Sequence, residues 1–490
     1  MISGMDKQAG FFEEYVYGSM IPKEHILVKI REKIDFSFIE EETRDLYSGT
    51  MGRPAYPAEL MFRMMFLEYY YNHSDVEISE MCRYNALYKY FAGLKIDGEI
   101  PDDTSLVVFR KRLGAERFER IFNRIIKECE KAGLLEGKRK LVDASKIVAD
   151  VAIPNTVNLL RQGRKVLIRQ ILGERRKDFR RLAKKYYTRE KEYQKPDEKK
   201  LEEELRKSRE FLEEIDGKYS ERVQKNVEAM RGIVRGQKRD RVVSFSDVDA
   251  RFGQTKKEKE SGFCGYKVHI AEDESEIVTS VDLLKGNQSE GEHLPELLDK
   301  EEEKGVKSKA VVGDGGYDNG NNYKEIKDRR MKAYITFNQR SRRKWKGFRY
   351  KRKQDKVECP AGKRSIGNIR QEKGNLYYFS VRDCGNCERK KECLKEGEDR
   401  ARVFVRGEYI HMKERPYKIA MKLRKMIERK FGEAKRWHNM ARARYRGQWR
   451  VKIQALMTFF VINIKRIVRL LEEKGMSTRC MEPGLGRAGP

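Results

Sequence analysis

The stretch Lys309-Ala-Val-Val-Gly-Asp-Gly-Gly-Tyr-Asp-Asn319 decides the fold that the sequence predicts. Ala310, Val311 and Val312 are typical of a short buried strand, and the glycines that follow end it. Asp314 stands at that break, where a carboxylate flanked by glycines can approach a metal ion or a phosphate closely. An Asp-Gly pair after a strand is more often a plain turn, so the stretch gains functional meaning only beside other carboxylates.

Two other stretches supply such carboxylates. Lys140-Leu-Val-Asp-Ala-Ser-Lys146 contains another apolar strand, which is expected to end in the carboxylate Asp143. A basic helix over residues 424–435 carries Glu428, a residue type that alone is usually a plain surface residue. Two divalent ions about 3.5–4 Å apart activate an attacking oxygen and stabilise a leaving one at a phosphodiester, and Mg²⁺ suits hard oxygen ligands. We therefore expect Asp143, Asp314 and Glu428 to meet at one sheet edge.

One further carboxylate competes with this assignment. Asp249 also precedes a predicted strand, which runs over Gly265–Ile270. The sequence alone favours Asp143 over Asp249 and leaves the choice to experiment.

The composition points to a polyanionic partner. The chain has 490 residues, with 108 Lys and Arg against 78 Asp and Glu, a net charge of +30. Such an excess favours nucleic acid before membrane. No apolar run reaches the length of a membrane span, and the N-terminus lacks a signal-peptide core. We expect a cytoplasmic, nucleoid-associated protein. Eight cysteines are few for this length, so a disulfide scaffold is not expected.

The pattern of helices, strands and charge predicts an α+β fold in several segments. A mixed-sheet catalytic core is expected to be interrupted by two insertions and preceded by a helical DNA-binding domain. The segments are a helix-turn-helix-like domain at 1–135, the core at 136–159 and 241–339, a charged helical hairpin at 160–240, a basic and cysteine-containing insertion at 340–410, C-terminal helices completing the core at 411–473, and a disordered tail at 474–490.

Two of these segments allow a second interpretation. The N-terminal helices fit a helical interaction domain as well as a DNA binder. The charges of the hairpin fit a solvated helix face better than a clamp or a dimer arm.

A basic stretch is predicted to contact nucleic acid. Residues 340–353 carry nine basic groups and no acidic one, with aromatic residues between them. Cations neutralise phosphates, and aromatic rings stack on unpaired bases. The candidate contacts are Arg342, Arg343, Lys344, Trp345, Arg349 and Lys351.

Four cysteines gather within a short stretch. Cys384 and Cys387 form a Cys-x-x-Cys pair, and Cys359 and Cys393 could complete a tetrahedral zinc site. Metal-free thiols explain the spacing equally well, so both interpretations stay open.

The basic helix around Glu428 is expected to face DNA. Arg424 lies one turn before Glu428 and Lys435 seven residues after it, so all three share a face. A carboxylate beside DNA needs neighbouring cations, so Arg424 and Lys435 are predicted to contact phosphates. Arg446, in the basic stretch that follows, is a further predicted DNA contact.

Over residues 50–470 the chain resembles bacterial insertion-sequence transposases of the DDE type, in the group numbered eleven-eighty-two, which is related to the insertion-sequence five superfamily. The matching motifs are Gly52-Arg-Pro54, Cys82-Arg-Tyr-Asn85, Pro101-Asp-Asp-Thr-Ser105, Val142-Asp-Ala-Ser-Lys146, Asp249-Ala-Arg251, Gly265-Tyr266, Asp314-Gly-Gly-Tyr317, Cys359-Pro360 and Arg446-Gly447. Related transposases carry Tyr-x2-Arg-x3-Glu-x6-Lys around the glutamate. Arg424, Glu428 and Lys435 fit that signature, whereas its tyrosine position is Met421.

The resemblance implies a ribonuclease-H-like domain whose acidic triad falls on Asp143, Asp314 and Glu428 and uses Mg²⁺ or Mn²⁺. It implies double-stranded DNA partners, namely the terminal inverted repeats of the element and the target, bound by a homodimer or larger assembly. The alternatives are a stand-alone nuclease and a non-catalytic DNA-binding relic. The intact triad disfavours the relic.

Overall fold

The computed structural model describes residues 11–48, 55–187, 195, 197–215, 219–237, 240–254, 262–338, 347–371, 374–394, 396–407 and 415–475. Several predicted features lie outside these residues. They are the motif at 52–54, the candidate DNA contacts Arg342, Arg343, Lys344 and Trp345, and the tail beyond 475.

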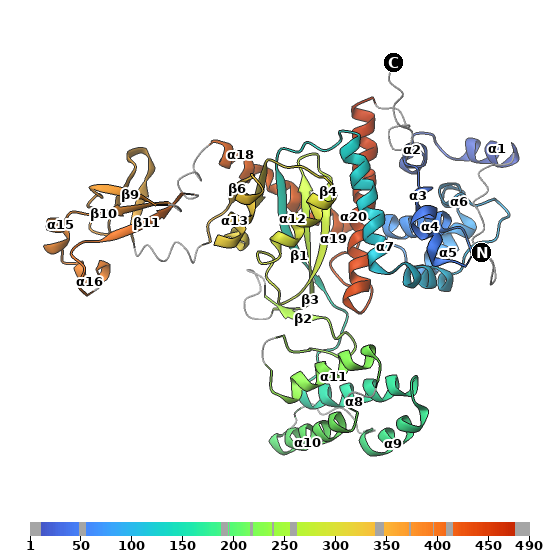
Figure 1. The fold of residues 1–490 in the computed structure, drawn as a ribbon. Helices are drawn as coiled ribbons and strands as arrows, with labels where there is room; N and C mark the ends of the chain where they lie inside the picture. The colour runs from blue at the N-terminus through green and yellow to red at the C-terminus, as the bar shows by residue number, and fades with distance from the viewer. Residues whose placement is uncertain are drawn as a thin grey trace.

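A six-stranded mixed sheet forms the centre of the molecule (Figure 1). Its strands are β1 (Lys140–Val148), β2 (Arg251–Gly253), β3 (Phe263–Asp273), β4 (Val278–Lys285), β5 (Ala310–Gly313) and β6 (Lys332–Ile335). The order is β2-β3-β1-β5-β6, with β4 also paired to β3. β1 is antiparallel to β3 and parallel to β5, and β5 is parallel to β6. The predicted mixed sheet is confirmed, and it is consistent with a ribonuclease-H-like domain.

Helices cover both faces of this sheet. α12 (Leu294–Glu303) and α13 (Gly320–Asp328) pack on one face in a cluster that includes Val142 of β1. α19 (Lys425–Trp437), which follows α18 (Arg415–Leu423), and α20 (Gln448–Glu473) pack on the other face in a cluster that includes Leu141 and Ile147. Because side chains alternate along a strand, Asp143 faces the side of α19.

The N-terminal part is helical, as predicted. It contains α1 (Phe11–Met20), α2 (Ile26–Lys33), α3 (Phe38–Thr43), the 3₁₀ helix η1 (Arg44–Leu46), α4 (Ala58–Tyr71), α5 (Asp75–Tyr84), α6 (Ala86–Ala92) and α7 (Asp103–Lys131). α7 joins two helical stretches across Gly114, whose φ of 63° and ψ of 173° are not helical.

These N-terminal helices share their apolar core with the sheet. The ring of Phe460 on α20 lies 5.2 Å from that of Phe62 and 6.4 Å from those of Phe36 and Phe66. All four side chains are fully buried, in the same cluster as the α20 face of the sheet. α20 therefore stands between the N-terminal helices and the sheet and joins them (Figure 1).

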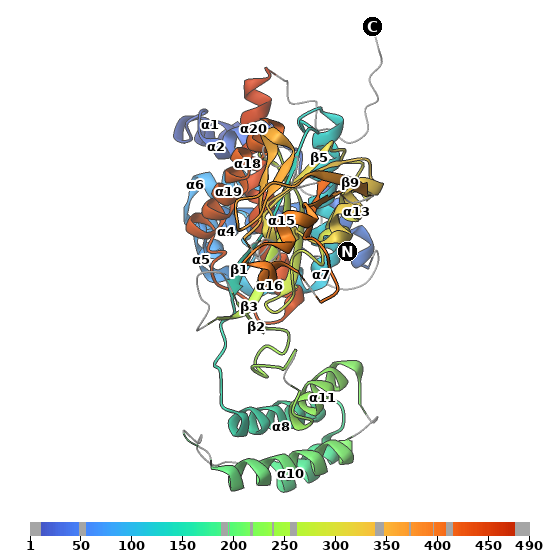
Figure 2. The same ribbon diagram turned by 90° about the vertical axis from the view of Figure 1, so that its left-hand side faces the viewer.

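The charged insertion is not the two-helix hairpin that the sequence predicts at 160–240. It has four helices, α8 (Thr156–Leu172), α9 (Arg176–Tyr186), α10 (Glu198–Ile215) and α11 (Glu221–Val234), around a core of their own. Arg164 and Glu204 are buried in that core as an ion pair. Charged residues inside the core interrupt the apolar pattern that would mark each helix in the sequence. For this reason the sequence predicts two helices instead of four. Figure 2 shows the insertion extending from one end of the sheet.

A small β unit lies on the opposite side of the sheet from the N-terminal helices (Figure 1). It contains β7 (Arg349–Lys351), η3 (Arg352–Gln354), β8 (Lys356–Glu358), β9 (Gly367–Gln371), β10 (Gly374–Tyr378), α15 (Val381–Gly385), α16 (Lys390–Cys393) and β11 (Arg402–Arg406). Its core is a separate cluster of eight buried residues, which includes Tyr377 and Val405. None of the described helices is both long enough and apolar enough to cross a bilayer.

The shared core predicts that the N-terminal helices and the sheet unfold together. Phe460→Ala should lower the free energy of unfolding by about 3–5 kcal/mol, because it empties a ring site between α4 and α20. Val108→Ala, at an exposed position of α7, is the matched control and should change little. Urea unfolding followed by two probes, one in each part, measures both. Two separate transitions, with only one shifted by Phe460→Ala, would contradict a single core.

Candidate active site

The candidate site lies where the pairing between two parallel strands ends. The ladder of β1 and β5 pairs Lys140 with Val311 and Leu141 with Val312, and it stops there. Asp143 follows on β1, and Asp314 follows directly after Gly313 at the end of β5. Both carboxylates therefore lie at the same notch in the sheet. The prediction that the strand ends at Asp143 is wrong, because β1 continues to Val148 through its pairing with β3.

Asp143 is held in a largely buried position. Its side chain is 22% exposed, and Oδ1 accepts a hydrogen bond of 2.9 Å from the backbone N–H of Ala144. Burial raises the pKa of Asp143 from 3.8 to about 6; the Ala144 hydrogen bond lowers it, and the charge of Asp314 raises it further.

Asp314 begins the short 3₁₀ helix η2 (Gly315–Tyr317) and accepts a 2.6 Å hydrogen bond from the N–H of Gly316. A Cβ atom at Gly316 would lie 2.9 Å from Oδ1 of Asp314 and 3.1 Å from Oε1 of Glu290. The missing side chain at Gly316 therefore leaves room for two carboxylates to approach the same turn.

Arg424 connects Glu428 to this notch. The Arg424 guanidinium lies 2.7 Å from Oε1 of Glu428 and 4.0 Å from Oδ2 of Asp143. Burial lowers the pKa of Lys435, and Lys146 lowers it further while Asp143 raises it, so Lys435 also lies near the notch. The structure thus brings the predicted carboxylates together with two of the predicted cations.

The carboxylate oxygens of Asp143, Asp314 and Glu428 suit a hard divalent ion, but their positions do not form a complete metal site. Among the described residues, no group of three or more His, Cys, Asp or Glu side chains could hold a metal ion as it stands. The guanidinium of Arg424 bridges Asp143 and Glu428 instead. Carboxylate oxygens are the ligands that Mg²⁺ prefers, and it takes few of them because it keeps several waters.

The rival carboxylate Asp249 has a structural role. Its side chain is buried, and it binds the Nζ atom of Lys225 on α11 at 2.7 Å. It also accepts a 3.2 Å hydrogen bond from the N–H of Gln448 at the start of α20. Asp249 therefore ties the helical insertion to the C-terminal helix.

The remaining predicted DNA contacts lie elsewhere. Arg446 is exposed and donates a 3.3 Å hydrogen bond to the carbonyl oxygen of Asp150. Arg349 and Lys351 lie on β7 in the small β unit, where Lys351 pairs with Glu358 at 3.3 Å. Figure 1 shows this unit to one side of the central sheet, and the unit contacts the chain near Asp314 through the 3.0 Å ion pair of Arg406 on β11 with Asp318.

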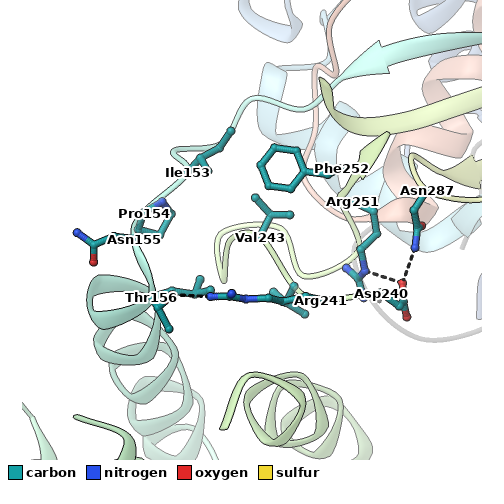
Figure 3. A pocket seen from close by; sticks show the side chains of 12 residues that line it. Ile153, Pro154, Asn155, Thr156, Asp240, Arg241, Val243, Arg251, Phe252 and Asn287 are labelled. Atoms are coloured by element: carbon teal, nitrogen blue, oxygen red, sulfur yellow. Dashed lines mark hydrogen bonds and ion pairs between the residues drawn. The ribbon is translucent and has the colours of Figure 1, made fainter. Parts of the chain in front are cut away.

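The hollow drawn in Figure 3 is not the acidic site. It lies where the two linkers enter the helical insertion, and half-exposed Ile153 and Phe252 line it. Asp240 there accepts hydrogen bonds from Arg251 at 2.7 Å and Asn287 at 3.1 Å. None of the three predicted catalytic carboxylates lines this hollow.

The four clustered cysteines line one small cavity of the β unit. Cys359, Cys384, Cys387 and Cys393 are all half-buried and unpaired as thiols. Burial raises the pKa of the Cys393 thiol, and the charges of Cys359 and Cys387 raise it further. The backbone N–H of Cys387 donates to the carbonyl of Cys384 at 3.4 Å, which closes the Cys-x-x-Cys turn.

The sequence did not single out Glu290 or Lys267, and it gave Tyr317 only as part of the motif Asp314-Gly-Gly-Tyr317. All three residues lie at the notch. Oε2 of Glu290 binds Nζ of Lys267 at 2.8 Å. The hydroxyl group of Tyr317 is buried and has no hydrogen-bond partner among the described residues. An acidic residue between a strand and a helix was the available signal for Glu290, and it is too common to stand alone.

Comparison with known families gives two matches. The family described as "Transposase DDE domain" matches residues 234–464, and the family described as "Transposase domain (DUF772)" matches residues 15–112. No solved structure matches the chain. Asp314 and Glu428 fall within the first range, whereas Asp143 precedes it, on the other side of the helical insertion.

The raised pKa of Asp143 predicts a cost in stability. In the unfolded chain this group ionises near 3.8, and in the folded protein near 6. The destabilisation of the folded protein by ionised Asp143 is therefore absent below about pH 4 and fully present above about pH 6. Asp143→Asn should raise the free energy of unfolding above pH 6, in metal-free buffer, by roughly 1–3 kcal/mol. Urea unfolding of both proteins across this pH range is the measurement. A difference that does not depend on pH would contradict the assigned pKa.

Proposed function

Since the chain is a transposase with an N-terminal transposase domain and a DDE catalytic domain, and therefore cleaves and joins DNA strands, we propose that Asp143, Asp314 and Glu428 are its catalytic carboxylates. We further propose that it belongs to the group numbered eleven-eighty-two and acts on the terminal inverted repeats of an insertion sequence.

One observation carries the assignment of the residues. Asp143 and Asp314 lie on neighbouring parallel strands where their pairing ends, and Arg424 links Glu428 to Asp143. These three residues come from regions far apart in the sequence, yet they share one notch. Asp249 is engaged by Lys225 and Gln448, which supports Asp143 as the first member of the triad.

The proposed reaction has two steps of the same kind. In the first, a water oxygen bonds to the phosphorus at the element end, and the bond to the 3′ oxygen breaks, leaving a free 3′-hydroxyl. In the second, that hydroxyl bonds to a phosphorus of the target, and a target phosphodiester bond breaks. Divalent ions held by the three carboxylates would activate the attacking oxygen and stabilise the leaving one.

The cations around the notch fit contacts with DNA phosphates. Arg424 and Lys435 lie beside the carboxylates, and exposed Arg446 follows on the same C-terminal segment. We propose that these residues bind the DNA backbone near the cleaved bond. A more distant stretch of DNA would be bound by Arg349, Lys351, Arg342, Arg343, Lys344 and Trp345. Two or more copies of the chain on one DNA would serve both ends of the element.

The test is cleavage of the DNA that flanks the gene. Asp143→Asn, Asp314→Asn and Glu428→Gln should each lower the cleavage rate in Mg²⁺ by roughly 10³-fold or more, about 4 kcal/mol of transition-state stabilisation. DNA binding in Ca²⁺ should change little, because the carboxylates serve the metal ions. Gel assays of cleavage and joining, with the cut positions mapped by sequencing, are the measurement.

Glu292→Gln is a matched control, because Glu292 is exposed and is not one of the proposed carboxylates. Cleavage without joining would indicate a stand-alone nuclease, and binding alone a non-catalytic relic. Full activity of Asp143→Asn together with loss in Asp249→Asn would overturn the triad.

We also propose that Cys359, Cys384, Cys387 and Cys393 bind a structural zinc ion. The four thiols line one cavity, in a unit whose own core has only eight buried residues. A unit this small gains stability from a bound metal. No three of these thiols stand close enough to hold an ion in the metal-free structure, so binding would draw them together.

Elemental analysis of the purified protein tests the zinc site. We expect about one zinc ion per chain. The double variant Cys384→Ser, Cys387→Ser should lose the ion, whereas the control Cys264→Ser, at a buried cysteine of β3, should retain it. Absence of zinc from protein that cleaves DNA normally would show that the four thiols carry no metal.

A further inference from the structure

A fourth carboxylate, Glu290, is held at the notch by a specific ion pair. Its Oε2 atom lies 2.8 Å from Nζ of Lys267, which also donates a 2.9 Å hydrogen bond to the carbonyl of Gln288. Its other oxygen, Oε1, approaches Gly316, as Oδ1 of Asp314 does. Lys267 therefore fixes one carboxylate oxygen and leaves the other on the side of Asp314.

Glu290 and Glu428 reach the notch from opposite faces of the sheet. Lys267 alternates with Val268 on β3, and Val268 belongs to the cluster on the α20 side. Lys267 thus points to the face covered by α12, and Glu290 precedes that helix. Glu428 comes from α19 on the other face. Asp143 and Asp314 consequently have one glutamate on each side.

An independent feature marks the side of Glu290 as a ligand position. The Tyr317 side chain is fully buried, and its hydroxyl group has no hydrogen-bond partner among the described residues. This hydroxyl feels the charges of Asp143, Glu290 and Asp314. A buried hydroxyl group without a partner is costly, and a metal-bound water would supply the acceptor or donor that it lacks.

We infer that Glu290 is a further metal-binding residue of the catalytic centre, which reaches the notch from the face opposite Glu428 and holds a divalent ion there together with Asp314. The inference rests on the proposed function. This arrangement needs no protein ligand beyond carboxylates.

The test compares the two partners of the ion pair. Glu290→Gln removes a ligand charge and should weaken binding of Ca²⁺, measured by calorimetry on the full chain without DNA, about tenfold or more. The Mg²⁺ concentration for half-maximal DNA cleavage should rise by a similar factor. Lys267→Met breaks the same ion pair but removes a positive charge, so metal binding should stay equal or tighten. Glu290→Asp should restore part of the affinity.

Each outcome has a separate meaning. Equal losses in Glu290→Gln and Lys267→Met would show that the pair is only structural and would overturn the inference. Unchanged metal dependence in Glu290→Gln, with cleavage by the unaltered protein, would do the same. Thermal unfolding of each variant shows whether it is folded, and Glu290→Asp keeps the test valid if Glu290→Gln is not. Absence of cleavage by the unaltered protein in Mg²⁺ would instead count against the proposed function.

Discussion

The parallel pairing of β5 with β1 is the constraint on which the active site depends. It covers only Lys140 and Leu141 on β1, so the strands part just before their carboxylates. A longer ladder would place Asp143 in a continuous sheet, and a shorter one would not fix Asp314 beside it. Gly313, Gly315 and Gly316 then turn the chain away from the sheet, and they have no side chains that would fill the notch.

The second constraint is the placement of α19 and α20 on one face of the sheet. α20 packs against the sheet and against the N-terminal helices, with Phe460 among the rings of Phe36, Phe62 and Phe66. α19, on the same chain segment, carries Arg424 at its start, followed by Glu428 and Lys435. The N-terminal helices and the helix that supplies the third proposed carboxylate therefore both pack against α20.

Much of this arrangement could be predicted from the sequence, because a carboxylate that follows an apolar run is a local pattern, although Asp143 lies within β1 and not at its end. Asp143 and Asp314 each follow an apolar run, and Glu428 lies one turn after Arg424. Other features depend on contacts between distant segments, which no local pattern reveals. The bridge from Arg424 to Asp143 and the approach of Glu290 to Gly316 are of this kind. The insertion was wrongly predicted as a hairpin because the buried pair of Arg164 and Glu204 looks like surface charge in a linear sequence.

The proposed chemistry requires metal ions to bind at the notch of Asp143 and Asp314. Replacing Mg²⁺ with Fe²⁺ and adding ascorbate and peroxide generates hydroxyl radicals at the metal, which cut the nearby protein backbone. Mass spectrometry then locates the cuts. If metal ions bind at the notch, the backbone should be cut close to residues 143, 290, 314 and 428, and excess Mg²⁺ should suppress all of these cuts. Cuts confined to residues 240–252, or the absence of any cut that Mg²⁺ suppresses, would contradict metal binding at the notch.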